Sequence, residues 1–184
     1  MKKFYLTLVA LFSLNLCGAE NLLTAAGASY TVFPGDWNKN LVNDKNLGKM
    51  IDPDFDRANE KRKGLLADGV TAQRAVCYNY HWTAKDQRFV TIVADLGKEY
   101  AVDSVRIVAF RNNEAYQPGN FEVAVSSDNI EFKELAKGDD WVTKARYERI
   151  ADVAASSAKC RYVRIKVWTC GSWINISEIG VFGK

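Results

Sequence analysis

The sequence predicts an all-β fold, an antiparallel β-sandwich, from two observations. Apolar and polar residues alternate in three runs between residues 88 and 125, which is typical of half-buried strands because successive side chains point to opposite faces. Turn-forming residues follow the first and third runs, at Leu96-Gly97-Lys98 and Ser127-Asp128-Asn129, and a fourth strand is expected at 131–135. The inward positions predicted for the three runs are Val90, Ile92, Ala94 and Leu96; Val105, Ile107 and Ala109; and Phe121, Val123 and Val125.

Residues 1–19 are predicted to be a secretory signal. Lys2 and Lys3 form a basic end, and the apolar stretch that follows at 4–16 is too short to span a bilayer comfortably. Cleavage after Ala19 would leave residues 20–184 as one domain of ordinary size. Lipidation at Cys17 is the alternative, and either route predicts a secreted, periplasmic or cell-surface protein.

The charge balance argues against nucleic acid as a partner. The chain has 25 Lys and Arg against 22 Asp and Glu, a formal net charge of +3, and Lys2 and Lys3 account for most of that excess. Without the signal the domain is close to neutral, so it lacks the basic surface that a nucleic-acid-binding protein needs.

Further strands are expected on either side of the three runs. Residues 76–80 alternate, and so do residues 161–168, with Val163, Ile165 and Val167 inward. The closing strand, residues 174–182, changes parity part-way, which a bulge at Ser177-Glu178 would explain. Trp141, which precedes another expected strand, is interpreted as a packing residue.

The cysteines that remain after removal of the signal are Cys77, Cys160 and Cys170. This odd count leaves at least one thiol unpaired within the chain. Cys160 and Cys170 flank a strand of roughly 33 Å, whereas a disulfide needs Cα atoms within about 7 Å of each other. A Cys77–Cys170 disulfide between loops at one end of the sandwich is therefore the favoured pairing, and three buried thiols are the alternative.

Short motifs in a fixed order relate the chain to a known family. They are Leu66-Ala67-Asp68-Gly69, Ala94-Asp95-Leu96-Gly97, Val105-Arg106-Ile107, Phe121-Glu122-Val123, Ser126 to Phe132, Arg161-Tyr162-Val163-Arg164-Ile165 and Ile176-Ser177-Glu178-Ile179. With them the chain resembles the discoidin family, also called the coagulation factor V/VIII type C domain, which overlaps the sugar-binding modules with a galactose-binding-domain-like fold. The resemblance runs from about Asn21 to Gly183 and implies a discoidin-like jelly roll with its first strand in residues 21–33.

The resemblance also implies a structural calcium ion. In that family an Asp, backbone carbonyls of the loop after it and a Glu near the C-terminus hold the ion, and they correspond here to Asp68, the loop with Thr71, and Glu178. Calcium takes six to eight hard oxygen ligands and accepts carbonyls, so few carboxylates are needed. The alternative is that Asp68 only closes a turn with Gly69.

A sugar site is the second implication. Carbohydrate sites combine an aromatic face with planar polar groups that form paired hydrogen bonds to hydroxyls, and they lie in loops on a rigid scaffold. The family's Asn-Gly pair is absent here, where Gly119-Asn120 reverses its order, so galactose itself is not specified. Trp82 and Trp173 could instead be partly buried packing residues. The candidate ligand-binding residues are His81, Trp82, Arg111, Asn113, Tyr116 and Trp173.

Enzyme chemistry has little support in the sequence. It contains no evident Ser-His-Asp order, nucleophile elbow or phosphate loop. The neighbouring acids Asp139 and Asp140 would point apart in a strand, whereas a glycosidase needs two facing carboxylates.

The sequence therefore predicts a non-catalytic module that binds a glycan. A cell-surface protein bound through a flat apolar patch, as in adhesion, is the first alternative, and membrane binding ranks below it.

Overall fold

The computed structural model describes residues 20–34, 65–69, 71, 76–79, 89–111, 113–171 and 173–184. In these ranges the regular elements are strands and short 3-10 turns, and no helix among them is long and apolar enough to cross a membrane. In chain order they are β1 (Glu20–Asn21), η1 (Leu22–Thr24), β2 (Ser29–Pro34), η3 (Leu65–Ala67), β3 (Val76–Asn79), β4 (Phe89–Phe110), η5 (Glu114–Tyr116), β5 (Pro118–Ser126), β6 (Lys133–Gly138), β7 (Val142–Thr143), β8 (Glu148–Thr169) and β9 (Trp173–Gly183).

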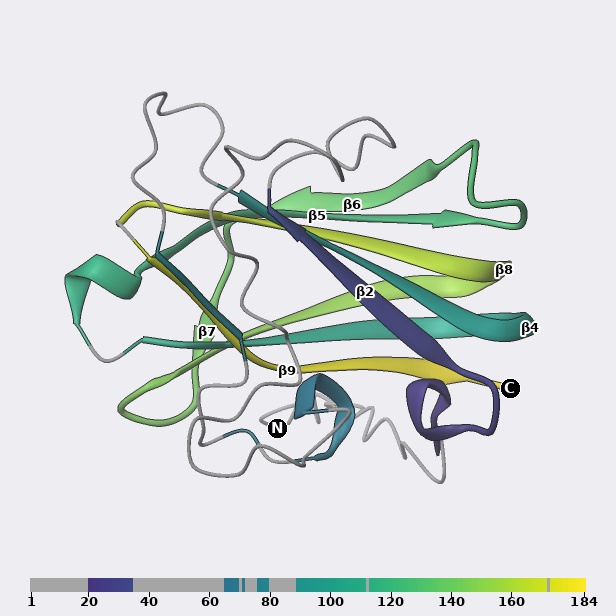
Figure 1. Cartoon of the computed structure of the whole chain (residues 1–184), viewed down its shortest axis with the longest axis horizontal. Coiled ribbons are helices and arrows are strands. Elements are labelled where there is room, and N and C mark those ends of the chain that lie inside the picture. The colour runs from purple at the N-terminus through teal and green to yellow at the C-terminus, as the bar shows by residue number, and fades with distance from the viewer. Residues whose placement is uncertain are drawn as a thin grey trace, which may run out of the picture.

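The two longest strands, β4 and β8, pass through both layers of an antiparallel sandwich. The first part of β4 pairs with β2 and with the last part of β8, and β5 and β6 extend this first layer. The second part of β4 pairs with the first part of β8 and with β9, and β1, β3 and β7 complete the second layer. One continuous hydrogen-bonded network therefore folds over onto itself (Figure 1), which confirms the predicted all-β sandwich.

The crossing between layers is marked by local irregularities in both strands. The register of β4 against β8 shifts between Asp95 and Tyr100. Gly97 has φ 80°, and a Cβ there would lie 2.9 Å from the carbonyl oxygen of Gly27. Ser156 and Ser157 in β8 also have positive φ, 51° and 58°. The turn predicted at Leu96-Gly97-Lys98 is thus a bend within one long strand rather than a break between two strands.

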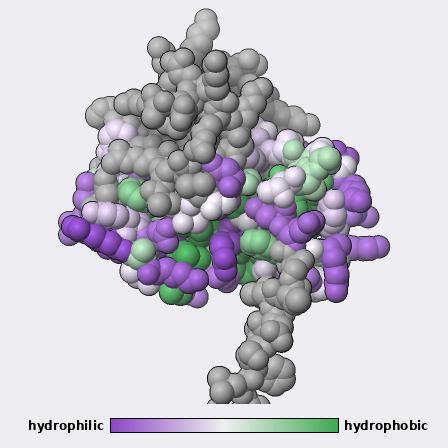
Figure 2. Space-filling model, turned by 90° about the horizontal axis from the view of Figure 1, so that it is seen from below, coloured by the Kyte–Doolittle hydropathy of each residue, from purple (hydrophilic) through white to green (hydrophobic). Residues whose placement is uncertain are grey.

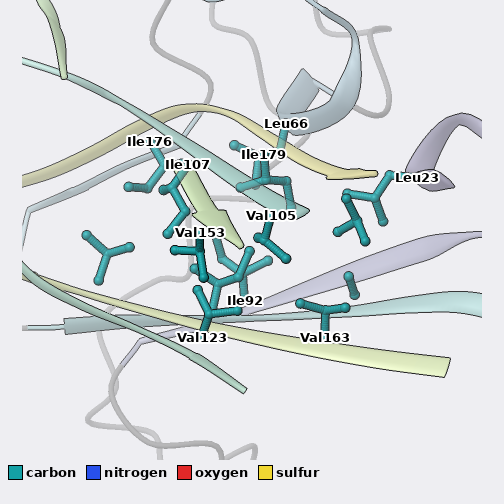
Figure 3. Close-up of a cluster of buried hydrophobic side chains, with 14 of the residues drawn as sticks. Leu23, Leu66, Ile92, Val105, Ile107, Val123, Val153, Val163, Ile176 and Ile179 are labelled. Atoms are coloured by element: carbon teal, nitrogen blue, oxygen red, sulfur yellow. The ribbon is translucent and has the colours of Figure 1, made fainter. Parts of the chain in front are cut away.

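The core lies between the two layers. Every inward position predicted for the three alternating runs is buried, and so are those predicted for residues 161–168. Figure 3 shows Ile92, Val123 and Val163 of one layer facing Ile107 and Ile179 of the other. Full burial of an aliphatic side chain of this size contributes about 1.5–3 kcal/mol, so this cluster is the main source of stability.

Other predicted elements are confirmed with small changes. The fourth strand is β6, which begins two residues later than expected. Trp141 packs edge-on against Phe121 with ring centroids 5.5 Å apart, and its Nε1 donates to the Gly119 carbonyl at 2.5 Å, so it is a packing residue. In β9, Glu178 lies opposite Val108 while Ile176 lies opposite Ala109, which places the predicted bulge at Ser177.

The predicted Cys77–Cys170 disulfide is not formed in the structure. Cys170 is an exposed free cysteine and Cys160 a buried one, so the alternative of three buried thiols also fails at Cys170. The reason is register: the backbone of Cys77 lies opposite Asn175 within the β3–β9 pair, whereas Cys170 lies in the loop before β9 begins. Burial, helped by the charge of Glu99, raises the pKa of Cys160 to about 11 and keeps it a neutral thiol.

The first and last described strands lie side by side. Glu20 pairs with Gly183, and Ala101 and Lys184 exchange backbone hydrogen bonds of 2.9 and 3.1 Å. This closure is at the right-hand end of the sandwich in Figure 1, away from the loops described next.

Candidate ligand-binding site

Loops from both layers gather at one end of the sandwich, on the left in Figure 1. There Phe110 at the end of β4 lies opposite Glu148 at the start of β8, and Trp173 at the start of β9 lies opposite Asn79 at the end of β3. The segments 111–117, 144–147 and 170–172 therefore connect strands at this end. The segment 80–88 also joins two strand ends there, but its His81 and Trp82 lie outside the described residues.

A stacked aromatic pair is the most definite feature of this end. Tyr116 and Trp173 have ring centroids 5.6 Å apart and an interplanar angle of 26°, and both are half-buried. Tyr116 is the last residue of η5 and Trp173 the first of β9. Two of the three loops predicted to form the site thus meet through their aromatic residues.

Backbone contacts fix the loop that leads into Trp173. Cys170 N–H donates to the Gln117 carbonyl at 3.0 Å. The Thr169 hydroxyl lies 3.0 Å from the Gln117 carbonyl and 2.8 Å from the Trp173 carbonyl, and it accepts from Gly171 N–H at 3.0 Å. A Cβ on Gly171 would overlap the Ala115 carbonyl, so only glycine allows the loop to approach η5 this closely.

Asn113 has a structural role that the sequence analysis did not anticipate. Its side-chain oxygen accepts from Ala115 N–H at 2.9 Å and caps η5. The carbonyl half of the amide is therefore engaged in positioning Tyr116. The amide nitrogen, which can only donate, is the part left to contact a ligand.

Arg111 follows directly after β4 and is half-buried, and its backbone N–H donates to the Tyr147 carbonyl at 2.6 Å. A second arginine lies near it: Arg149 in β8, opposite Ala109, with Nη1 donating to the Glu148 carbonyl at 2.9 Å. Burial, together with the charge of Arg111, lowers the pKa of Arg149. Sequence reasoning missed Arg149 because its place depends on cross-strand register, although the alternation Arg149, Ala151, Val153 puts it on the inward face.

The predicted metal ligands are brought together in part. Gly69 N–H donates to Glu178 Oε1 at 3.1 Å, while Glu178 Oε2 is buried and has no hydrogen-bond partner among the described residues. Burial raises the pKa of Glu178 to about 7, and the charge of Asp68 adds to that rise. The Thr71 hydroxyl turns elsewhere and donates to Glu148 Oε1 at 2.6 Å. Among the described residues, no group of three or more Asp, Glu, His and Cys side chains is arranged so that it could hold a metal ion.

Comparison with known proteins identifies the family. A search of curated proteins finds no match. A family model for the F5/8 type C domain matches residues 56–179, more than half of the chain. The chain belongs to the F5/8 type C domain family. This confirms the resemblance to the discoidin family that the sequence motifs predicted.

Solved structures similar to this F5/8 type C domain include CBM32 carbohydrate-binding modules. CpGH89CBM32-5 from Clostridium perfringens, solved with GalNAc-β-1,3-galactose, is 15% identical with a TM-score of 0.54 and covers 90% of this chain and 100% of its own. The CBM32 of AlyQ, solved with 4,5-unsaturated mannuronic acid, is 20% identical with a TM-score of 0.52, covering 84% and 93%. A Ruminococcus gnavus GH29 fucosidase, solved with fucose, is 23% identical with a TM-score of 0.57, covering 90% of this chain and 27% of its own.

The F5/8 type C domain thus presents three kinds of group at its loop end. Tyr116 and Trp173 supply aromatic surface, Arg111 and Arg149 supply charged planar donors, and Asn113 supplies an amide donor. These groups can bind and orient a polar ring that has one apolar face. Asp68 and Glu178 lie close to each other through the contact of η3 with β9 and form a separate feature.

Proposed function

We propose that this domain is a secreted, non-catalytic module that binds a carbohydrate through the loops at this end of the sandwich. The observation that carries the proposal is the stacked Tyr116–Trp173 pair, which two separate loops bring together. The part of this half-buried aromatic pair that stays accessible fits the apolar C–H face of a sugar ring. Similar structures solved with sugars support the same function, although at their level of identity they show only the fold.

The polar groups around this pair would bind the hydroxyls. Arg111 would donate paired hydrogen bonds from its guanidinium, and the Asn113 amide nitrogen would donate a further one. His81 and Trp82 of segment 80–88 would complete the site from the third loop. Gly171 and the Asn113 cap keep the aromatic pair in place before a ligand arrives, which lowers the entropic cost of binding.

A structural calcium ion is part of the proposal. Asp68 and Glu178 would hold it with their carboxylates, and the loop at Thr71 would contribute backbone carbonyls. The support is the buried Glu178 Oε2, which the described part of the chain leaves without a hydrogen-bond partner and which lies near the charge of Asp68, since a hard cation would satisfy that oxygen and offset the repulsion. The ion would fasten η3 to β9 and take no part in chemistry.

The surface favours a glycan over an adhesion partner that binds through an apolar patch. Among the described residues, the exposed large apolar side chains are Ile130, Val142 and Tyr147, which belong to different segments. On the face seen in Figure 2, apolar residues are scattered among hydrophilic ones. Protein-binding surfaces concentrate apolar area in one patch.

The test is a glycan-array screen of residues 20–184 in calcium and then in chelator, with Trp173→Ala and Arg111→Ala beside the wild type. Specific binding that either substitution abolishes would support the site. Asn120→Ala, an exposed residue at the same end, serves as the control and should bind normally. A folded wild type that binds no glycan would contradict the proposal and favour a cell-surface protein as partner.

A further inference from the structure

The two arginines of the loop end lie on the same face of neighbouring strands. Arg149 is opposite Ala109, and the Arg111–Tyr147 hydrogen bond continues the β4–β8 pairing one residue beyond Phe110. Residues two apart on a strand share a face, so Arg111 and Arg149 are diagonal neighbours, within reach of long side chains. That face is the inward one, because Ala109 is 1% exposed and Ala151 2% exposed. Arg111 and Arg149 therefore both belong to the inward face, at the end of the strands where the loops begin.

Neither of these arginines has a carboxylate partner among the described residues. The ion pairs in those parts of the chain are Arg106–Asp152, Arg161–Asp95 and Arg164–Glu122. Arg149 donates to a backbone carbonyl instead, and its charge is opposed both by burial and by Arg111. Two partly buried cations that lie near each other cost folding free energy unless an anion compensates them.

Among the described residues, Glu148 and Glu114 do not supply that anion. Glu148 neighbours Arg149 in β8 but lies on the opposite face of the strand, where it accepts from Thr71. Glu114 is exposed on η5. The loop before β8 adds more positive charge, since Arg146 lies 5.1 Å from the ring of Tyr147.

We infer that Arg111 and Arg149 form an anion subsite beside the aromatic pair, and that the preferred ligand is an acidic glycan that carries a carboxylate or a sulfate. This inference rests on the proposed carbohydrate-binding function. A guanidinium group binds a carboxylate or sulfate with two parallel hydrogen bonds, and two such groups can share one anion. A neutral sugar leaves both cations uncompensated, so the pair discriminates against it.

Matched glycan pairs test the inference by isothermal titration calorimetry. One pair is α-1,4-linked digalacturonic acid and α-1,4-linked galactobiose, which differ in their carboxylates, and the other is 3′-sulfolactose and lactose, which differ in a sulfate. We expect the wild type to bind the acidic member of at least one pair about tenfold more tightly, as for a hydrogen bond to a charged group. The pair that shows the preference identifies the anion.

Arg149→Gln should remove this preference, so that the acidic and the neutral member of the pair bind with affinities within about twofold of each other. Arg149→Lys keeps the positive charge but loses the two parallel N–H donors of the guanidinium group. Its preference for the acidic member should therefore lie between that of the wild type and that of Arg149→Gln. Lys159→Gln removes one exposed positive charge at the opposite end and should behave as the wild type. Because Arg149 has no carboxylate partner in the part of the chain that the structure describes, the melting temperature of Arg149→Gln should equal or exceed that of the wild type.

Three outcomes would overturn the inference. Equal binding of acidic and neutral members by the wild type would exclude an anion subsite and leave the carbohydrate-binding function standing. A lower melting temperature of Arg149→Gln, with parallel loss of both members, would make Arg149 a structural residue. Absence of binding to every glycan on the array would remove the proposed function together with the subsite.

Discussion

Single residues decide how closely the loops of this domain approach each other. Gly171 is the clearest case, because the Ala115 carbonyl occupies the space that any side chain would need. The composition of the sequence predicted a loop at this position. It did not predict how closely Gly171 approaches Ala115, because that depends on where η5 lies in the folded chain. Arg149 was missed for the same reason: its neighbour Arg111 is distant in sequence and adjacent only through the β4–β8 register.

Gly171→Ala should separate the loop from η5 and disturb the Tyr116–Trp173 stack. We expect a loss of about 1–3 kcal/mol in the free energy of unfolding, as for other overpacked sites, together with weaker glycan binding. Chemical denaturation would measure the loss of stability, and a glycan titration followed by tryptophan fluorescence would measure the weaker binding. Ser127→Ala, an exposed position at the opposite end, is the control. A variant as stable as the wild type would show that the loop can shift without penalty.

The Asp95–Arg161 pair predicts a pH dependence of stability. Arg161 donates to both Asp95 oxygens, at 2.8 and 2.9 Å, and Gly97 N–H donates to Oδ1 at 2.8 Å. The hydrogen bonds from Arg161 above all hold the pKa of Asp95 below its ordinary value. The stabilisation is therefore present above the pKa of the unfolded chain, about 4, and is lost as the pH falls through the lower folded value.

Asp95→Asn should accordingly destabilise the protein at pH 7 by about 1 kcal/mol or less, since Arg161 is substantially exposed and water screens the pair. The difference from the wild type should shrink below about pH 4, where the wild-type carboxylate also becomes protonated. Urea unfolding at a series of pH values would measure this, with the exposed Glu134→Gln as control. A difference that stays constant down to pH 2 would assign the effect to geometry rather than charge.

At the scale of elements, alternation predicted the strands well because burial itself imposes the period. The inward residues predicted for the runs within 88–125 and for 161–168 are all buried, and the parity change in β9 located its bulge, whereas the core residues Ala151, Val153 and Ala155 in the first half of β8 were not predicted. The disulfide failed because sequence spacing does not show how far each cysteine lies along the pair β3–β9. The contact of η3 with β9 was predicted only through the family resemblance.

That contact leads to a prediction about calcium. Saturating calcium should raise the melting temperature of the wild type, because a ligand at a hundred times its dissociation constant adds about 2.7 kcal/mol to stability. Glu178→Gln should lose this response, since it replaces a carboxylate oxygen of the proposed site. Differential scanning fluorimetry with calcium and with EDTA would show it, and Glu134→Gln should respond as the wild type does. An unchanged response in Glu178→Gln would place any bound calcium elsewhere.

At the scale of the whole molecule, β4 and β8 make the two layers interdependent. Local alternation could not reveal this, because each half of a bent strand has the same pattern as a separate strand. Each layer takes its central pair from the same two strands, so neither layer can lose its core face without disturbing the other.

Ile92→Ala, a substitution in the first layer, should therefore weaken the second layer too. Its cost should be about 2–5 kcal/mol, and hydrogen exchange of β9 amides such as Ile179 should accelerate by a corresponding factor. Val142→Ala, which removes an exposed side chain from β7, is the control. Acceleration confined to the first layer would indicate that the layers open independently.

The pairing of Glu20 with Gly183 has a consequence for engineering. Because β1 and the end of β9 lie side by side at the end of the sandwich opposite the ligand-binding loops, a short linker could join them. New termini could then be opened in the exposed turn at Ser127. Such a circularly permuted domain would keep every contact of the ligand-binding end. The same geometry allows the module to be grafted into a host protein at one point, with its loops directed away from the host.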